Sequence, residues 1–352
     1  MREIVPSGTH IDFLGRRHIA IAVSLAVLAA GVLAGAIQGV KFGIDFVGGT
    51  EMAVRFDPGV DVDESALRNV VGRCGVDEPS VVRYGDDVER KEFLIKFKGA
   101  EAGEVPDCPL TETDRAELAE KAEKQGGDAG NLESAHIISR IQRGIRNDVG
   151  EYETLRVDFV GPRVGSELTE AGVQAMTIAV LLILAYIAFR FSSRFAPGAV
   201  VALVHDVGIT CAVFVIFGLE FDLRVLAALL AILGYSLNDT IIIYDRIREN
   251  MEIRTKYDLL DVLNRSVNQT LSRTLLTSVT TLAAVLCLLF LGGEVIRPFA
   301  LAMAIGIVVG TYSSTFIAAP TLLFLETRFG DSPDAKAAAA KRKKEKDRER
   351  AA

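Results

Sequence analysis

Six long apolar runs constrain the fold of this chain more than any other feature of its sequence. A helix needs about 20 apolar residues to cross roughly 30 Å of hydrocarbon, and each run approaches that length. Half of all residues are hydrophobic. The sequence therefore predicts a polytopic α-helical membrane protein with six transmembrane helices. The runs are residues 18–38, 171–191, 196–217, 223–244, 274–292 and 299–325.

The basic residues between the runs predict an orientation, because cytoplasmic loops carry an excess of Lys and Arg. Basic residues precede the first run, separate the second from the third and the fourth from the fifth, and follow the sixth as KRKKEKDRER. We therefore expect residues 1–17 and the basic tail 326–352 in the cytosol, with residues 39–170 outside it. The tail would also suit contact with anionic membrane lipid.

The first run has a second interpretation. RRHIAIAVSLAVLAAGVLAGA has the charged start, apolar body and small-residue end of a cleavable signal peptide. Its apolar body of about 20 residues exceeds the usual 7 to 15, so we favour an uncleaved transmembrane helix at 18–38. Cleavage would leave the sidedness of the other five runs unchanged.

Residues 39–170 predict a separate α+β domain, because their hydrophobic pattern is periodic rather than continuous. EMAVRF, PSVVRYG, KEFLIKFK and YETLRVDFVGP read as strands, and DVDESALRNVVGRC and SAHIISRIQRGIRND read as helices. The order β-α-β-β-α-β is the ferredoxin-like arrangement. Residues 100–134 are polar, acidic and rich in Gly, and we expect an inserted loop with one short helix there.

The acidic character of this domain bears on its partners. It argues against nucleic acid and favours a cationic or unfolded polypeptide. Cys74 and Cys108 both fall in the domain and could pair in an oxidising compartment. Because Cys108 lies in the loop that we expect to be loosest, we do not predict a disulfide. Cys211 and Cys287 lie within apolar runs.

The sequence lacks the common motifs of catalysis. It has no G-x-x-x-x-G-K-[ST] phosphate loop and no H-E-x-x-H, and its four His residues are scattered. GYSLN matches a serine nucleophile elbow for three residues, but Asn238 stands where the second Gly is required. We therefore predict no enzyme activity, no catalytic residue, no metal and no cofactor. Energy for any work would come from a partner or an ion gradient.

The fourth run carries an ionisable group. GYSLNDTIII places Asp239 in apolar surroundings, together with Ser236, Asn238 and Thr240. A carboxylate at the centre of a lipid-facing helix costs about 2.5 to 3.5 kcal/mol, so such residues usually face a bundle interior and mark a proton or substrate path. The alternative is that Asp239 is only a structural hydrogen-bonding group between helices.

Two other charged residues favour the functional interpretation. Asp206 lies about 15 Å into the third run at a rise of 1.5 Å per residue. Arg273 lies at the start of the fifth run, at a depth comparable to Asp239, whereas Arg246 lies about 10 Å farther along the axis. A nearby guanidinium favours a charged carboxylate, and separation in a dry bundle favours protonation. Helix movement would therefore change the proton affinity of Asp239, although the sequence leaves H⁺ and Na⁺ open as coupling ions.

Small residues repeat along two of the runs. Gly31, Gly35 and Gly39 are four residues apart, as are Gly306 and Gly310. Small residues at this spacing allow helix backbones to approach closely. We expect helix contacts at these positions and assign them no chemistry.

Five motifs resemble those of the SecF family, the smaller half of the SecD and SecF accessory complex of the bacterial preprotein translocase. They are, in order along the six runs, GIDFVGGT, GPRVGSEL, HDVGIT, GYSLNDTIIIYDRIREN and SRTLLTSVTTL. The resemblance covers nearly the whole chain, apart from residues 101–134 and the basic tail. The acidic loop departs from the compact outside domain that the family leads us to expect.

The resemblance implies a six-helix half of an RND-like assembly in the bacterial cytoplasmic (inner) membrane. It implies use of the proton-motive force to draw preproteins outward, with SecD, the SecYEG channel, YajC, YidC and the translocating preprotein as partners. The family ties the aspartate of the ND pair and the arginine of the fifth span to proton transport. Those residues are Asp239, beside Asn238, and Arg273 here, while Asp206 matches a further family motif.

Two other functions remain open from the sequence. An RND-type exporter of small molecules would share intramembrane carboxylates, but it needs a larger outside portion. A membrane scaffold without any proton role would use Asp239 only to tie helices together.

Overall fold

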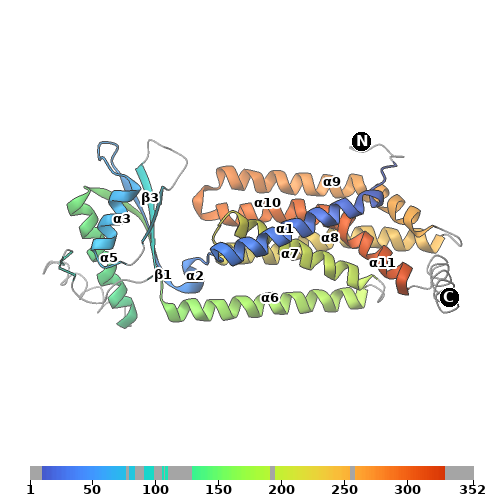
Figure 1. The fold of residues 1–352 in the computed structure, drawn as a ribbon, viewed down its shortest axis with the longest axis horizontal. Helices are drawn as coiled ribbons and strands as arrows, with labels where there is room; N and C mark the ends of the chain where they lie inside the picture. Colours follow the sequence, from blue (N-terminus) through green and yellow to red (C-terminus); the bar gives the residue numbers. More distant parts are fainter. Residues whose placement is uncertain are drawn as a thin grey trace, which may run out of the picture. The chain divides into compact units, whose positions relative to one another are not determined.

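The structure of the protein is a computed structural model. The chain forms two compact units, which we call the α/β unit (Phe42–Val173) and the membrane unit (Met1–Lys41 with Gln174–Ala352). Figure 1 shows the elements of both units. The residues that the structure describes are 10–76, 79–83, 91–98, 105–106, 108–109, 129–190, 195–253 and 258–329.

One antiparallel sheet organises the α/β unit, with the strand order β2-β3-β1-β4. Figure 1 labels its two central strands, β1 and β3. Met52 in the central strand β1 lies opposite Ile95 of β3 and Val157 of β4. The order and directions confirm the predicted β-α-β-β-α-β arrangement. The elements are α2 (Ile44–Val47), β1 (Gly49–Phe56), α3 (Glu64–Arg73), β2 (Ser80–Arg83), β3 (Lys91–Phe97), α5 (Ala129–Asp148) and β4 (Tyr152–Val160).

Alternation along the strands separates a core from a charged sheet face. Met52, Val54 and Phe56 alternate along β1 and belong to one buried cluster that includes residues of α3 and α5. The intervening residue Glu51 pairs with Arg156 of β4 at 2.5 Å. The sheet is thus apolar toward its helices and charged on its other face.

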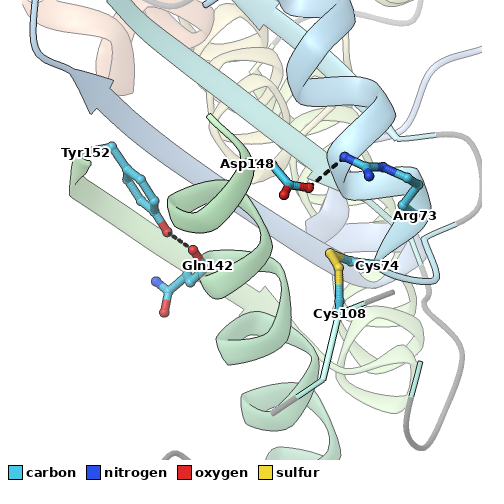
Figure 2. The surroundings of a disulfide bond; sticks show 6 residues. All are labelled: Arg73, Cys74, Cys108, Gln142, Asp148 and Tyr152. Atoms are coloured by element: carbon cyan, nitrogen blue, oxygen red, sulfur yellow. Dashed lines mark hydrogen bonds and ion pairs between the residues drawn. A yellow bond between two sulfur atoms is a disulfide. The ribbon is translucent and has the colours of Figure 1, made fainter. Parts of the chain in front are cut away.

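A disulfide joins Cys74 to Cys108, and our expectation that these residues do not pair was wrong. Their Cα atoms lie 5.2 Å apart, and both side chains are buried. Val105 and Cys108 are only 8% and 5% exposed, so this part of the polar segment is anchored in the core. Figure 2 shows the disulfide at the end of α3, beside α5. The short helix predicted within 100–134 lies outside the described residues.

Polar contacts around the disulfide hold α3, α5 and β4 together (Figure 2). Arg73 pairs with Asp148 at 2.6 Å, which joins the ends of α3 and α5. The Tyr152 hydroxyl of β4 donates to the Gln142 carbonyl at 3.0 Å, and burial raises the pKa of Tyr152 to about 12.

Six helical segments in the described part of the chain are long and apolar enough to cross a membrane, which confirms the predicted six-helix class. Helix α10 packs against α7, α8 and α9, and α7 packs against α1 (Figure 1). The elements are a 3₁₀ turn (Leu14–Arg16), α1 (Arg17–Gln38), α6 (Pro162–Arg190), α7 (Ala196–Ile216), α8 (Leu223–Ile253), α9 (Leu259–Leu291), α10 (Gly293–Ser313), a π-helical turn (Ser314–Ala318) and α11 (Ala319–Phe329).

Two helices extend beyond the apolar runs 223–244 and 274–292. Helix α8 continues after its run ends, and α9 begins well before its run starts. The polar extensions bond to each other, since Asn250 donates to Ser266 Oγ at 2.8 Å. Hydropathy therefore marked the apolar length of each span rather than the length of its helix.

The sixth span is interrupted by the π-helical turn rather than forming one regular helix. Pro320 has no N–H to donate to the carbonyl of Phe316, four residues earlier, which weakens the regular hydrogen-bond ladder here. The Ala318 carbonyl, also in this turn, accepts from the hydroxyl of Tyr244 in α8 at 3.0 Å.

The predicted helix contacts are close at three of the five glycine positions. A Cβ at Gly31 would collide with Ala212 of α7, and one at Gly306 would collide with Ile232 of α8. A Cβ at Gly310 would lie 3.0 Å from Ser236 Cβ. At Gly35 the contact is ordinary, and Gly39 has nothing within 4 Å but ends α1 with a positive φ of 75°.

The disulfide can be tested by thiol labelling of the denatured full chain. Of the four cysteines, we expect only Cys211 and Cys287 to react with a maleimide before reduction, and all four after it. Four reactive thiols before reduction would contradict the structure.

The disulfide joins two residues that are 34 apart in sequence. Its loss through Cys108→Ser should therefore cost about 3 to 4 kcal/mol of stability.

Tyr152 should show a high-pH titration. With a pKa near 12 in the folded chain and near 10 when unfolded, its contribution to stability is fully present below about pH 10 and is lost as the pH rises toward 12. The tyrosinate absorbance of the wild type minus that of Tyr152→Phe should have a midpoint near pH 12. A midpoint near pH 10 would show that the phenol is not buried.

Candidate functional site

The buried face of α8 carries the polar groups of the fourth span. Ser236, Asp239 and Thr240 are 1%, 1% and 2% exposed. Their spacing of three and four residues places them on one side of the helix. Asp239 therefore lies in the interior of the membrane unit, whereas Asn238 is exposed and takes no part in this cluster.

Asp239 has a sparse set of hydrogen bonds. Its Oδ2 accepts one bond from Ser278 Oγ of α9, at a long distance of 3.5 Å. Ser278 accepts in turn from Thr311 Oγ1 of α10 at 2.7 Å and from the Tyr235 hydroxyl at 3.3 Å. A single serine hydroxyl thus connects Asp239 to α9 and α10.

Four buried hydroxyls follow one face of α9, and we call them the hydroxyl row. They are Ser266, Thr270, Thr274 and Ser278, four residues apart, and the row is about 18 Å long at 1.5 Å per residue. It runs from the N-terminal part of α9 to the serine beside Asp239.

Thr274 differs from the other members of the hydroxyl row. Ser266 and Thr270 donate to backbone carbonyls of α9, and Ser278 donates to Asp239. Thr274 Oγ1 is buried and has no hydrogen-bond partner within the described residues. A buried hydroxyl without a partner costs about 1 to 3 kcal/mol of stability. This cost suggests that Thr274 serves a function.

A second buried carboxylate, Asp206 of α7, has a full set of partners. Its Oδ2 accepts from Ser313 Oγ of α10 at 2.7 Å and also from Ser236 Oγ of α8. Its Oδ1 bonds to Nδ1 of the neighbouring His205 at 2.8 Å. Side chains of three helices therefore converge on one carboxylate.

His205 extends this cluster to α1. Its Nε2 lies 2.9 Å from Ser24 Oγ, and Ser24 lies 3.3 Å from the Tyr312 hydroxyl of α10. The lack of a side chain at Gly310 allows α10 to approach Ser236 closely. The cluster around Asp206 thereby links α1, α7, α8 and α10.

The two carboxylates are suited to different tasks. Three side-chain donors hold Asp206 in place, so a change at this residue would disturb four helices. Within the described residues Asp239 has one long bond, so it can exchange a proton or contact a cation with little rearrangement. No cluster of three or more His, Cys, Asp or Glu that could hold a metal ion occurs in the described ranges.

Arg273, which its comparable depth favours over Arg246 as a partner of Asp239, does not pair with it directly in this structure. Its side chain is exposed, and no ion pair joins it to Asp239 in the described part of the chain. Consecutive residues of a helix point about 100° apart, and the next residue, Thr274, occupies the inward position.

Sequence reasoning missed several of these residues. His205 was visible beside Asp206 in HDVGIT, and the hydroxyl row was visible as Ser or Thr at every fourth position of α9. Ser24 and Ser313 carried no signal, because their partners lie 181 and 107 residues away in the sequence.

Comparisons with known proteins point to one family. The family model described as protein export membrane protein SecD/SecF, C-terminal, matches residues 141–328, and the SecD/SecF GG motif matches residues 34–60. A protein translocase subunit SecF from Magnetococcus marinus is 41% identical over 92% of this chain and 94% of its own length. The corresponding protein of Desulfurispirillum indicum is 38% identical over 91% and 93%.

Two solved structures are also similar. The crystal structure of SecDF, a translocon-associated membrane protein from Thermus thermophilus, matches with a TM-score of 0.71 at 34% identity, over 91% of this chain. SecDF in a super-membrane-facing form matches with a TM-score of 0.60 at 34% identity, over 97% of this chain. This chain spans only 39% and 41% of the length of those two proteins.

The difference between the two carboxylates predicts different effects on stability. Asp206→Asn turns an amide toward three donors and should cost about 1 to 3 kcal/mol, whereas Asp239→Asn should cost less than about 1 kcal/mol. Denaturant unfolding of both variants in detergent measures this difference. Equal losses would contradict the distinction between them.

Proposed function

Because the chain belongs to the SecF family of protein translocase subunits, we propose that it pairs with SecD and uses the proton-motive force to promote preprotein export. The membrane concerned is the bacterial cytoplasmic membrane, with both termini in the cytosol. The solved relatives are named SecDF and are more than twice as long as the matched chain, which supports SecD as the partner that supplies the remainder. SecYEG, YajC and YidC are the further partners that the family implies.

The observation that carries the proposal is a buried carboxylate with one weak hydrogen bond at the end of the hydroxyl row. Asp239 takes up the coupling ion, and the hydroxyl row leads toward it from the N-terminal part of α9. Thr274, which has no protein partner in the described residues, can bond to a passing hydrated ion. The same oxygen atoms suit H⁺ as hydronium and Na⁺ alike.

Arg273 supplies the switch in this proposal. A turn of α9 about its axis would exchange Thr274 for Arg273 near Asp239, because the two residues are adjacent on the helix. The approaching guanidinium would favour the charged carboxylate and release the proton. One charge that crosses the membrane field is worth about 2.3 kcal/mol per 100 mV, enough to shift a two-state equilibrium more than tenfold.

The sidedness of the α/β unit has independent support. Disulfides form and persist in oxidising compartments outside the cytosol, and this unit contains the Cys74–Cys108 bond. An extracytoplasmic α/β unit would meet the preprotein as it leaves the channel. In this proposal, ion uptake at Asp239 moves the membrane helices, and the α/β unit transmits that movement to the preprotein.

Asp239→Asn tests the proposal directly. The variant should still copurify with SecD, because Asp239 contributes little to packing, but it should lose all gradient-dependent stimulation of preprotein export. Export into membrane vesicles, measured with and without a proton gradient, gives the readout. Asn238→Ala is the matched control, since Asn238 is the exposed neighbour on the same helix.

Each alternative gives a distinct outcome in this experiment. Unchanged stimulated export in Asp239→Asn would contradict the proposal and favour a scaffold, in which Asp239 only ties α8 to α9. Gradient-dependent release of a small molecule, without any effect on preproteins, would favour an exporter.

A further inference from the structure

A cavity of about 650 Å³ lies at one end of the membrane unit, away from the site around Asp239. Its walls come from the start of α1, the start of α9 and one side of α11. Its size falls within the 300 to 1,000 Å³ that is usual for sites of small ligands.

The position of the cavity along the helices places it at a membrane surface. The first apolar run, 18–38, begins at the cavity and the sixth, 299–325, ends there, while the polar start of α9 lies beside them. This is the level at which the headgroups of phospholipids meet their acyl chains.

The chemistry of the walls is amphipathic. Ile21, Leu323 and Phe324 supply apolar surface. Arg17 and His18 supply two basic side chains, and Asp258 supplies one carboxylate. The combination of two basic groups, one acid and an apolar wall matches a ligand that has a phosphate, an amine and a hydrocarbon chain.

The two polar walls are already oriented by the protein. Arg17 Nη1 donates to the Leu14 carbonyl at 2.8 Å, which fixes the guanidinium while leaving its other N–H groups to bind a ligand. Asp258 Oδ1 accepts from the Leu260 amide at 3.0 Å as the N-cap of α9. A carboxylate has two acceptor oxygens, so Asp258 can also accept from an amine.

Hydrogen bonds also join the wall at the start of α1 to the wall at the start of α9. The side chain of Asn264 in α9 accepts from the Phe13 and Leu14 amides at 3.1 and 3.0 Å. Asn268 donates to the Ile11 carbonyl at 2.8 Å. The starts of α1 and α9, which carry the basic and acidic groups of the cavity, are thereby fixed to each other.

We propose that this cavity binds one phospholipid whose headgroup contains both a phosphate and a primary amine, as in phosphatidylethanolamine. Arg17 and His18 hold the phosphate, and Asp258 holds the ammonium group. An acyl chain lies along Ile21, Leu323 and Phe324. Arginine suits this role because its planar fork matches phosphate oxygens.

Other occupants fit the charges less well. A phospholipid without an amine would leave Asp258 facing a phosphate of like charge. The chain's own C-terminal segment, KRKKEKDRER, is mostly basic and would be repelled by Arg17. The single carboxylate among the cavity residues is therefore the feature that selects for the amine.

Native mass spectrometry of the full chain in mild detergent tests this proposal. With phosphatidylethanolamine or phosphatidylglycerol of identical acyl chains, we expect one retained lipid and about tenfold tighter binding of the first. Arg17→Gln should weaken the binding of phosphatidylethanolamine about tenfold. Arg16→Gln should not, since Arg16 is an exposed arginine outside the cavity.

Asp258→Asn gives a second test that does not depend on Arg17. Asparagine caps a helix as well as aspartate does, so α9 should keep its start. The variant should bind both lipids equally, because its amide no longer favours the ammonium group. Equal binding of the two lipids by the wild type, the same loss in Arg16→Gln as in Arg17→Gln, or an unchanged preference in Asp258→Asn would each overturn the proposal.

Discussion

The requirement that polar groups inside a bilayer find their partners within the protein governs this structure. Asp206 meets that requirement completely, through His205, Ser236 and Ser313, and in doing so it fastens α7 to α8 and α10. The close approach of α10 to α8 at Gly310 brings Ser313 and Ser236 to the same carboxylate. Asp239 meets the requirement only weakly, through Ser278. Of these two carboxylates, Asp206 is thus fixed and Asp239 is able to react.

This contrast gives the proposed mechanism its physical basis. A fully bonded group resists exchange, so the helices joined at Asp206 form a frame against which α9 can move. The hydroxyl row and Arg273 both belong to α9, and they present alternative neighbours to Asp239 from adjacent positions on one helix. Movement of a single helix relative to the frame would therefore change the environment of the reactive carboxylate.

The sequence predicted the parts of the fold that depend on periodicity. Six apolar runs indicated six spans, and alternation in the strands indicated the sheet and its order. Contacts between distant residues could not be predicted in this way. Comparable depth suggested Arg273 as a neighbour of Asp239, but depth says nothing about helix rotation, and Thr274 takes the inward position. The disulfide was missed because composition described residues 100–134 as one polar loop, whereas Val105 and Cys108 are buried.

The central claim is that Asp239 changes its protonation during the working cycle. Infrared difference spectroscopy on proteoliposomes that contain this chain and SecD tests it most directly, with Asp239→Asn as the reference. The account predicts a protonated-carboxyl band that appears and disappears as the proton gradient is applied and collapsed, and that is absent from the variant. A wild-type spectrum in which Asp239 keeps one ionisation state under both conditions would contradict the account.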